Sequence, residues 1–143
     1  ILEELQNDCS RTNQELALQV HVSPPTCLRR VRRLIESGVI ERQVAIVSPE
    51  ALGAGITAIV EVMLDRQPAE ALAEFEQRVA QEGVVQQCYR VSPGPDFMLI
   101  VHVADMASYH AFVHRALTAT LNVRNVRTFF SIHRAKFDPR IAV

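Results

Sequence analysis

Four arginines within five positions are the side chains in this chain best suited to bind a polyanion. They are Arg29, Arg30, Arg32 and Arg33, and the first acidic residue after them is Glu36. A guanidinium group carries donors that suit phosphate oxygens and also the edge of guanine in the major groove. A solvated surface helix more often interleaves acids with its bases. The spacing therefore favours contact with double-stranded DNA over a merely solvated charged face.

A helix-turn-helix is the element that must hold these arginines. Residues 12–15 form a capping-box pattern, which starts a helix. A turn at 20–22 follows, and Ser23 before Pro24 gives an N-cap with proline at the first helical position. Gly38 is suited to end this second helix. A basic second helix in such an arrangement is typical of proteins that read DNA.

The positions 26–35 divide into two faces of a helix. At about 100° per residue, the apolar arc holds Cys27, Leu28, Val31, Leu34 and Ile35. The opposite face holds Thr26, Arg29, Arg30 and Arg33, with Arg32 on the flank. We expect the apolar arc to pack on the preceding helices and the polar face to point toward base edges and phosphates.

The composition limits the classes of protein to which the chain can belong. Its 143 residues, 48% of them hydrophobic, suffice for one domain or two small ones, and the net charge is −1. Nucleic-acid binding must therefore use a local patch. No apolar run approaches the roughly 20 residues of a membrane span and no charged-then-apolar leader is visible, so no membrane partner is expected.

The cysteines predict the compartment. Cys9, Cys27 and Cys88 show no C-x-x-C spacing, which favours a reducing cytoplasm, with Cys27 as a core residue. Because the chain begins at Ile1 and not at a methionine, we expect residues to be missing before it.

The second half of the chain changes character near Ser48. Strand-like residues at 39–40 and 46–47 predict a wing after the basic helix, and 49–55 is typical of a connector. Further on, the pattern predicts strands at 56–64, 84–91, 97–103 and 126–133, and helices at 68–81 and 105–117. The order βαββαβ is the ferredoxin-like split unit. We therefore expect an α+β chain with a winged helix-turn-helix domain at 1–47, a linker at 48–55 and a second domain at 56–143.

Two other motifs have the spacing of a dinucleotide site and of a metal site, but their context does not favour either. The run 53–58 fits the dinucleotide fingerprint G-x-G-x-x-A, but it feeds a β-branched strand and does not open a helix. His110 and His114 stand four residues apart on a predicted helix. They lack the glutamate of H-E-x-x-H and a third ligand, which favours partly exposed helix histidines.

Two function classes compete with a DNA-binding regulator. An RNA-recognition module shares the βαββαβ order, but residues 97–103 do not fit the aromatic pattern that stacks bases. An enzyme needs a nucleophile or a base, and the sequence holds no G-x-S-x-G, P-loop, zinc cluster or cysteine–histidine arrangement. We expect no catalytic residues, no metal site and no cofactor.

An ordered set of residues runs through both halves of the chain. In the first half these are 1–2, 15–17, Ser23, 29–34 and 38–40, followed by 52–53 before the first predicted strand. In the second half they are Gly94, 96–97, 105–106, Tyr109 and 127–128. Over essentially its whole length, the chain thereby resembles the Lrp/AsnC, or feast/famine, family of prokaryotic transcription factors.

The resemblance implies roles for particular residues. The third helix of the family enters the major groove, which implies DNA contacts by Ser23, Pro24, Pro25, Thr26, Arg29, Arg30, Arg32 and Arg33. The βαββαβ domains of two chains pair into a homodimer that assembles further, to a tetramer or an octamer. A small effector, typically an amino acid, binds between dimers. The implied effector residues are Ser92, Pro93, Gly94, Pro95 and Asp96 in one turn, and Met106, Phe129, Phe130 and Ser131 further on.

Two departures from the family pattern concern the effector. Pro93 stands where the family usually has glycine, and Gly94 comes one position later. Proline fixes φ and removes an N–H donor, which could remodel a pocket that uses backbone donors. Residues 121–122 replace the family's Pro-Gly before the last strand. The alternative to an amino-acid-responsive regulator is therefore an orphan DNA-binding regulator or an architectural protein of the same fold.

Overall fold

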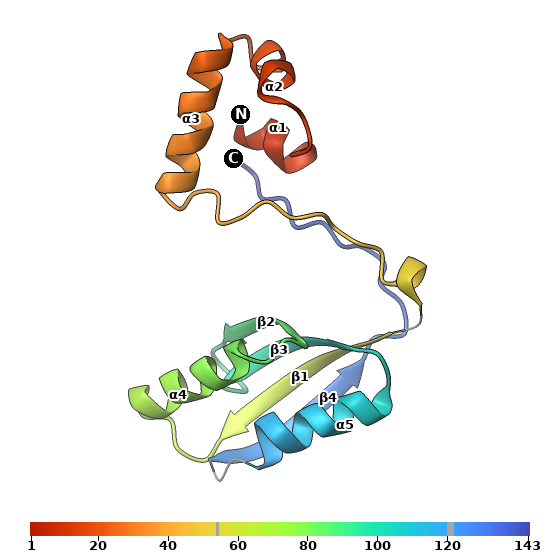
Figure 1. The fold of residues 1–143 in the computed structure, drawn as a ribbon. Coiled ribbons are helices and arrows are strands. Elements are labelled where there is room, and N and C mark those ends of the chain that lie inside the picture. Colours follow the sequence, from red (N-terminus) through yellow and green to blue (C-terminus); the bar gives the residue numbers. More distant parts are fainter. Residues whose placement is uncertain (54, 120–121) are drawn as a thin grey trace. The chain divides into compact units, whose positions relative to one another are not determined.

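The chain divides into two compact units (Figure 1). The computed structural model describes residues 1–53, 55–119 and 122–143. The helical unit comprises residues 1–46 together with 136–143, and the sheet unit comprises 47–135. Residues 136–143, expected in the second domain, thus belong to the helical unit. Ala54 of the dinucleotide-like run and Leu121 lie outside the described residues.

The helical unit is built from α1 (Leu2–Asn7), α2 (Asn13–Gln19) and α3 (Pro24–Glu36). The predicted capping box is present at the start of α2. The Thr12 N–H donates to the Glu15 carboxylate (2.7 Å), and the Glu15 N–H donates to the Thr12 hydroxyl (3.3 Å). His21 adopts a φ of 54°, which is uncommon outside glycine, in the turn before α3. The predicted helix-turn-helix is confirmed.

The core of the helical unit is small. Its fully buried side chains are Leu16, Ala17 and Cys27. Leu28 and Ile35, expected to face this core, are 39% and 47% exposed, so that part of the prediction is wrong. The reason is that α1 and α2 contain only 6 and 7 residues and cover only part of the apolar arc of α3.

The strand expected as a wing between residues 39 and 47 does not form. Residues 41–48 are extended but belong to no strand. Val44 and Ile46 are 55% and 60% exposed. A strand needs a paired neighbour as well as β-branched residues, and the apolar composition of this segment alone does not supply one.

The sheet unit has the predicted βαββαβ order. Its elements are β1 (Ile56–Leu64), α4 (Ala69–Ala80), β2 (Val85–Arg90), β3 (Phe97–Val103), α5 (Met106–Phe112) with the π-helical η2 (Val113–Thr118), and β4 (Val123–Phe130). A short 3₁₀ turn, η1 (Glu50–Leu52), precedes β1. The antiparallel strands lie in the order β2-β3-β1-β4. The last strand begins and ends three residues earlier than the predicted 126–133, because Val123 pairs with Leu64.

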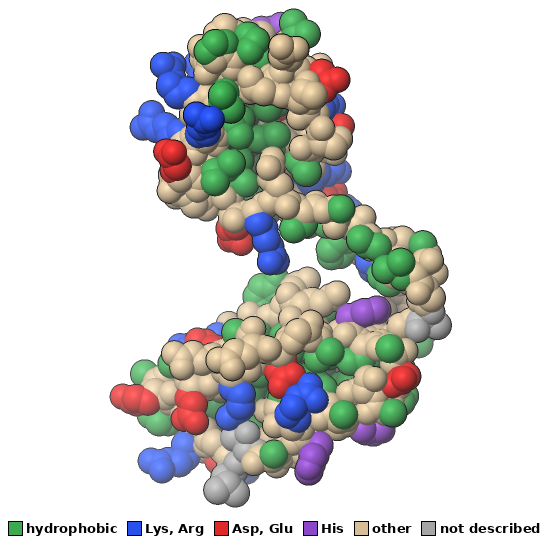
Figure 2. Space-filling model, viewed as in Figure 1, with side chains coloured by type: hydrophobic (Ala, Val, Ile, Leu, Met, Phe, Trp, Pro, Cys, Tyr) green, Lys and Arg blue, Asp and Glu red, His purple; other side chains and the backbone are tan. Residues whose placement is uncertain are grey.

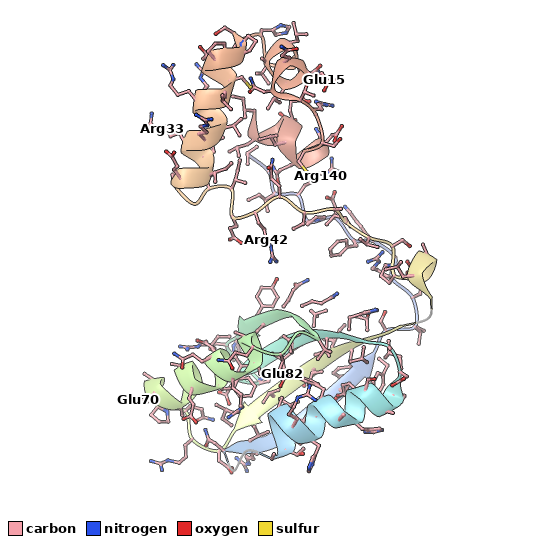
Figure 3. The ribbon with its side chains drawn as sticks, viewed as in Figure 1. Glu15, Arg33, Arg42, Glu70, Glu82 and Arg140 are labelled. Carbon is pink, nitrogen blue, oxygen red and sulfur yellow. The ribbon has the colours of Figure 1, made fainter. Side chains whose placement is uncertain are left out.

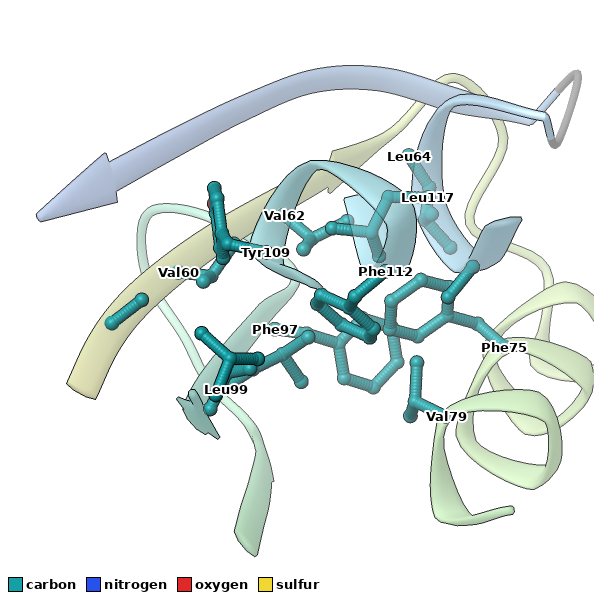
Figure 4. Packing of buried hydrophobic residues seen from close by; sticks show 14 residues of the cluster. Val60, Val62, Leu64, Phe75, Val79, Phe97, Leu99, Tyr109, Phe112 and Leu117 are labelled. Atoms are coloured by element: carbon teal, nitrogen blue, oxygen red, sulfur yellow. The ribbon is translucent and has the colours of Figure 1, made fainter. Parts of the chain in front are cut away.

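One face of this sheet carries the main core. Alternate residues of β1 and β3 are buried against α4, α5 and η2 (Figure 4). Phe75 of α4 stacks on Phe97 of β3, with ring centroids 4.5 Å apart. The intervening residues of β1 and β3, such as Ile59 and Ile100, face the other side, which neither α4 nor α5 covers.

Candidate DNA interface and effector site

The arginines of α3 lie on its exposed face. Arginine side chains, drawn in blue, gather over α3 in Figure 2. Arg29, Arg30, Arg32 and Arg33 are all exposed. Within the described part of the chain, none of these four side chains has an ion pair or a hydrogen bond. Arg11 of the same unit, by contrast, is paired with Glu4 and Asp8. The guanidinium donors of α3 are therefore free to bind an external anion.

The N-terminal end of α3 is fixed by polar contacts. The Ser23 hydroxyl donates to the Thr26 hydroxyl (2.9 Å). The Asn13 side-chain amide donates to the carbonyl of Pro24 (2.9 Å) and so ties the start of α2 to the start of α3. Pro24 and Pro25 are exposed beside these groups. All the predicted DNA-contact residues therefore share one helix and its entering end, and Asn13 is a positioning residue that the sequence pattern did not indicate.

Hydrogen bonds within the chain fix the turn at residues 92–96. Gly94 has a φ of 116°, a conformation that side-chain-bearing residues rarely adopt. One carboxylate oxygen of Asp96 accepts hydrogen bonds from the Leu64 N–H (2.7 Å) and the Gln67 side-chain amide (3.4 Å). The Asp96 N–H donates to the carbonyl of Val62 (2.9 Å). Asp96 therefore secures the turn to the end of β1, a structural role that the sequence did not indicate.

The other predicted effector residues lie at the opposite end of the sheet. The Ser131 N–H donates to the carbonyl of Thr57 (2.9 Å), and Phe130 is opposite Ala58. Met106 follows β3, whose last residue is opposite Ile56. Strands rise about 3.3 Å per residue, so the two groups are separated by roughly 20 Å along β1. A single chain does not bring the two groups of predicted effector residues together.

Aromatic and hydroxyl groups order the end of β4. The hydroxyls of Tyr109 and Thr128 share a hydrogen bond, and the Tyr109 ring meets the edge of Phe130 at 5.1 Å between centroids. Burial raises the pKa of Tyr109, and the hydrogen bond with Thr128 opposes that change. The guanidinium of Arg127 lies over the Phe129 ring at 4.8 Å. Phe129 and Phe130 are both 42% exposed, so they present apolar surface at this end of β4.

A small cavity lies beside Ser131. It measures about 190 Å³, and its walls include Thr57, His102 and Ser131. The Thr57 hydroxyl and the His102 Nδ1 are 3.0 Å apart and hold each other in place. The imidazole of His102 lies so close to Gly55 that a Cβ there would come within 2.5 Å of its Nε2. Thr57 and His102 are therefore polar groups that line the cavity at the Ser131 end, and the sequence pattern did not indicate them.

The described structure does not support a dinucleotide site at residues 53–58 or a metal site at His110 and His114. Gly53 and Gly55 lead into β1, so no helix opens after them as a dinucleotide site requires. His110 and His114 are exposed on α5 and η2. Among the described residues, no three His, Cys, Asp or Glu side chains form a possible metal site. None of the described helices is long and apolar enough to span a membrane.

Both units of the chain are similar to known protein domains. The Lrp/AsnC ligand-binding domain matches residues 57–141, and the winged helix-turn-helix DNA-binding domain matches 1–41. The leucine-responsive regulatory protein of Rhizobium meliloti is 43% identical over 136 residues, which are 95% of this chain and 87% of that protein. An AsnC family transcriptional regulator from Agrobacterium tumefaciens superposes with a TM-score of 0.87 and 31% identity, covering 99% of this chain and 92% of the other. A regulator from Neisseria meningitidis in complex with L-methionine gives a TM-score of 0.87 and 28% identity, with coverages of 99% and 91%.

These matches cover both the helix that carries the free arginines and the sheet unit. They also set the DNA-binding class apart from the RNA-binding and enzymatic alternatives. The chain belongs to the Lrp/AsnC family of DNA-binding transcriptional regulators, which are not enzymes.

Proposed function

We propose that this regulator binds double-stranded DNA through α3 and responds to an amino acid bound by its sheet units. The observation that carries the DNA half of the proposal is the set of exposed arginines on α3, which have no carboxylate partner among the described residues. The support for the amino acid is the L-methionine complex of the similar Neisseria regulator. The activity belongs in the cytoplasm, where prokaryotic DNA is found.

On the DNA, α3 enters the major groove with its N-terminal end foremost. Arg29, Arg30 and Arg33 neutralise phosphates or pair with guanine, and Arg32 reaches the backbone from the flank. The residues at the entering end, Ser23, Pro24, Pro25 and Thr26, approach the bases and sugars. Because helix-turn-helix dimers bind two half-sites, the operator is pseudo-palindromic.

The uncovered face of the sheet is where two copies pair. Ile59 lies between Ile100 of β3 and Phe129 of β4 on this face. Met98 and Tyr89 extend the apolar surface across β3 and β2. When two such faces pack together, the apolar side chains of both sheets are buried between them. The resulting homodimers assemble further, to a tetramer or an octamer.

Assembly also accounts for the divided effector site. The turn at 92–96 and the group Met106, Phe129, Phe130 and Ser131 lie at opposite ends of one sheet. A ligand that touches both groups must therefore lie between chains, where the turn of one copy meets the second group of another. The ligand then shifts the assembly equilibrium only by its difference in affinity between the two states.

One observation favours the alternative, an orphan regulator without an amino-acid effector. The Asp96 carboxylate already accepts two hydrogen bonds within its own chain.

Selection of bound fragments from genomic DNA, followed by titration of one of them, tests the proposal. Arg30→Ala should weaken the binding free energy for that fragment by about 1–3 kcal/mol, and so raise the Kd, if Arg30 reads a base. Arg124→Ala is the matched control, because Arg124 is exposed on β4 of the sheet unit. Equal affinities of the wild type and Arg30→Ala across salt concentrations would remove Arg30 from the interface.

The effector half is tested on the same fragment. L-methionine at millimolar concentration should change the Kd of the wild-type protein and raise its melting temperature, as a ligand of the folded state must. A flat response to L-methionine and the other common amino acids would leave the orphan regulator as the correct description.

A further inference from the structure

The last eight residues of the chain belong to the unit that contains α3. Residues 136–143 lie with residues 1–46, although they follow β4 of the sheet unit along the chain. We call residues 136–143 the C-terminal strap. The polypeptide therefore passes between the two units twice, once at 46–47 and once at 135–136.

A side chain of α1 binds the backbone of the strap as a neighbouring strand would. The Gln6 amide donates to the carbonyl of Ile141 (2.9 Å), and the N–H of Ile141 donates to the Gln6 carbonyl oxygen (2.8 Å). A side-chain amide carries both an N–H donor and a carbonyl acceptor, so it can pair with both backbone groups of one residue. The interaction joins residues 135 positions apart in the sequence.

Arg140 adds a second, charged attachment (Figure 3). Its guanidinium donates to the Asn7 side chain of α1 (2.6 Å) and to the Asp138 carboxylate (2.8 Å). Hydrogen bonds from Arg140 hold the pKa of Asp138 well below its usual range. The strap is thus stiffened by its own ion pair and fixed to two consecutive residues of α1.

The helix that receives the strap needs outside support. α1 has 6 residues and no fully buried side chain, and helices this short are unstable alone. Its Leu5 packs partly on the cluster of Leu16, Ala17 and Cys27, and Cys27 lies on α3. A cavity of about 600 Å³ is bounded by α1, residues 39–46 and residues 139–143 of the strap. The strap therefore forms one wall of this cavity, and the helical unit is loosely packed around it.

We propose that the C-terminal strap supports the DNA-binding surface by clamping α1. The strap holds α1 through Gln6 and Asn7. α1 in turn supports α3, because Leu5 packs against the cluster that contains Cys27 of α3. The connection to DNA binding rests on the function proposed above.

Gln6→Ala and Arg140→Ala in the full chain, with Gln19→Ala as control, test this inference. Gln19 is an exposed glutamine at the end of α2. In hydrogen exchange, Gln6→Ala should speed exchange of amides at 2–8 and at Ile141 about 5-fold or more, while β1 and β3 keep their protection. Arg140→Ala should act in the same direction, and Gln19→Ala should change neither region.

The same variants are then titrated against the selected DNA fragment without any amino acid. Gln6→Ala should raise the Kd about 3- to 10-fold, since a loosened α1 no longer fixes α3. Unchanged exchange in Gln6→Ala and Arg140→Ala would overturn the clamp. Faster exchange with an unchanged Kd would overturn the connection to DNA binding. If the wild type bound no DNA, the proposed function would fail, and the exchange data would still decide the clamp.

Discussion

The two units of this chain differ greatly in the amount of apolar surface they bury. Among the described residues, the helical unit has 3 buried hydrophobic residues, whereas the sheet unit has 14. Hydrophobic burial is the main favourable contribution to folding, so the sheet unit is a stable platform and the helical unit is marginal by itself. The folding of a marginally stable unit depends on contacts from outside it. Binding of a ligand or a partner can then change a large fraction of its free energy of unfolding.

The same contrast holds for the arginines. In the sheet unit Arg90 is paired with Glu76 at 2.7 Å and Arg115 with Glu82 at 2.6 Å. On α3 the arginines have no such partners in the described part of the chain. Charges paired within the chain stabilise structure, whereas charges left exposed in a cluster are available to a polyanion. Arg90 and Arg115 therefore contribute to the structure of the sheet unit, whereas the arginines of α3 are available to DNA.

The core of the sheet unit should give the largest effect. Leu99→Ala removes a fully buried side chain beneath α4 and α5, and should lower the free energy of unfolding by about 2–5 kcal/mol. Leu52→Ala, at a leucine that is 79% exposed, should change it by less than about 0.5 kcal/mol. Urea unfolding followed by circular dichroism measures both. Equal effects of the two variants would contradict the assigned core.

Leu16→Ala should sharpen the contrast between the units. It removes one of only three fully buried side chains and should cost about 2–3 kcal/mol. Because the helical unit is marginal, this loss should unfold it locally, and hydrogen exchange should show lost protection in α2 and α3 but not in β1. Leu18→Ala, at a position that is 77% exposed, is the control. Simultaneous loss of protection in both units would mean that they fold as one.

Asp96→Ala should give an intermediate effect. The substitution leaves the N–H of Leu64 without its carboxylate acceptor, which costs about 1–3 kcal/mol when the group is removed from water. Asp65→Ala, one residue beyond β1, is the nearby control. Because the variant loses stability, a lost response to L-methionine in Asp96→Ala does not by itself place Asp96 in the effector pocket. A variant with wild-type stability would show that Asp96 does not hold the turn.

The surface ion pair between Glu82 and Arg115 should give the smallest effect. The hydrogen bond from Arg115 lowers the pKa of Glu82. A carboxylate with a lowered folded-state pKa stabilises the fold above its unfolded pKa, near 4.3, and loses this contribution as the pH falls below it. Glu82→Gln should therefore cost less than about 1 kcal/mol at pH 7 and nothing once the carboxylate is protonated.

Melting curves from pH 7 down to pH 3 measure the effect of Glu82→Gln. Glu74→Gln, an exposed acid on α4, is the control. A cost of Glu82→Gln that stays constant over this range would exclude the ion pair as its source.

Features set by neighbouring residues could be predicted from the sequence. The Thr12–Glu15 capping box, the start of α3 after Ser23 and the β-branched strand at 56–64 all depend on local spacing, and the structure contains each of them. The Ser23 side chain, however, makes no capping hydrogen bond. The strand at 39–47 was wrong because strand formation depends on a partner elsewhere in the chain. The contacts of Gln6 with Ile141 and of Asp96 with Leu64 were missed for the same reason, since no local pattern indicates them.

The salt dependence of DNA binding tests the central claim most directly, because it counts the phosphates that the arginines neutralise. The logarithm of the affinity should fall linearly with the logarithm of the salt concentration, with a slope of about −0.9 for each neutralised phosphate. Replacing Arg29 and Arg33 together by alanine should make that slope shallower by nearly 2 if both contact phosphates, whereas Arg124→Ala should leave it unchanged. A slope that is the same in all three proteins would contradict the assignment of α3 as the DNA-binding helix.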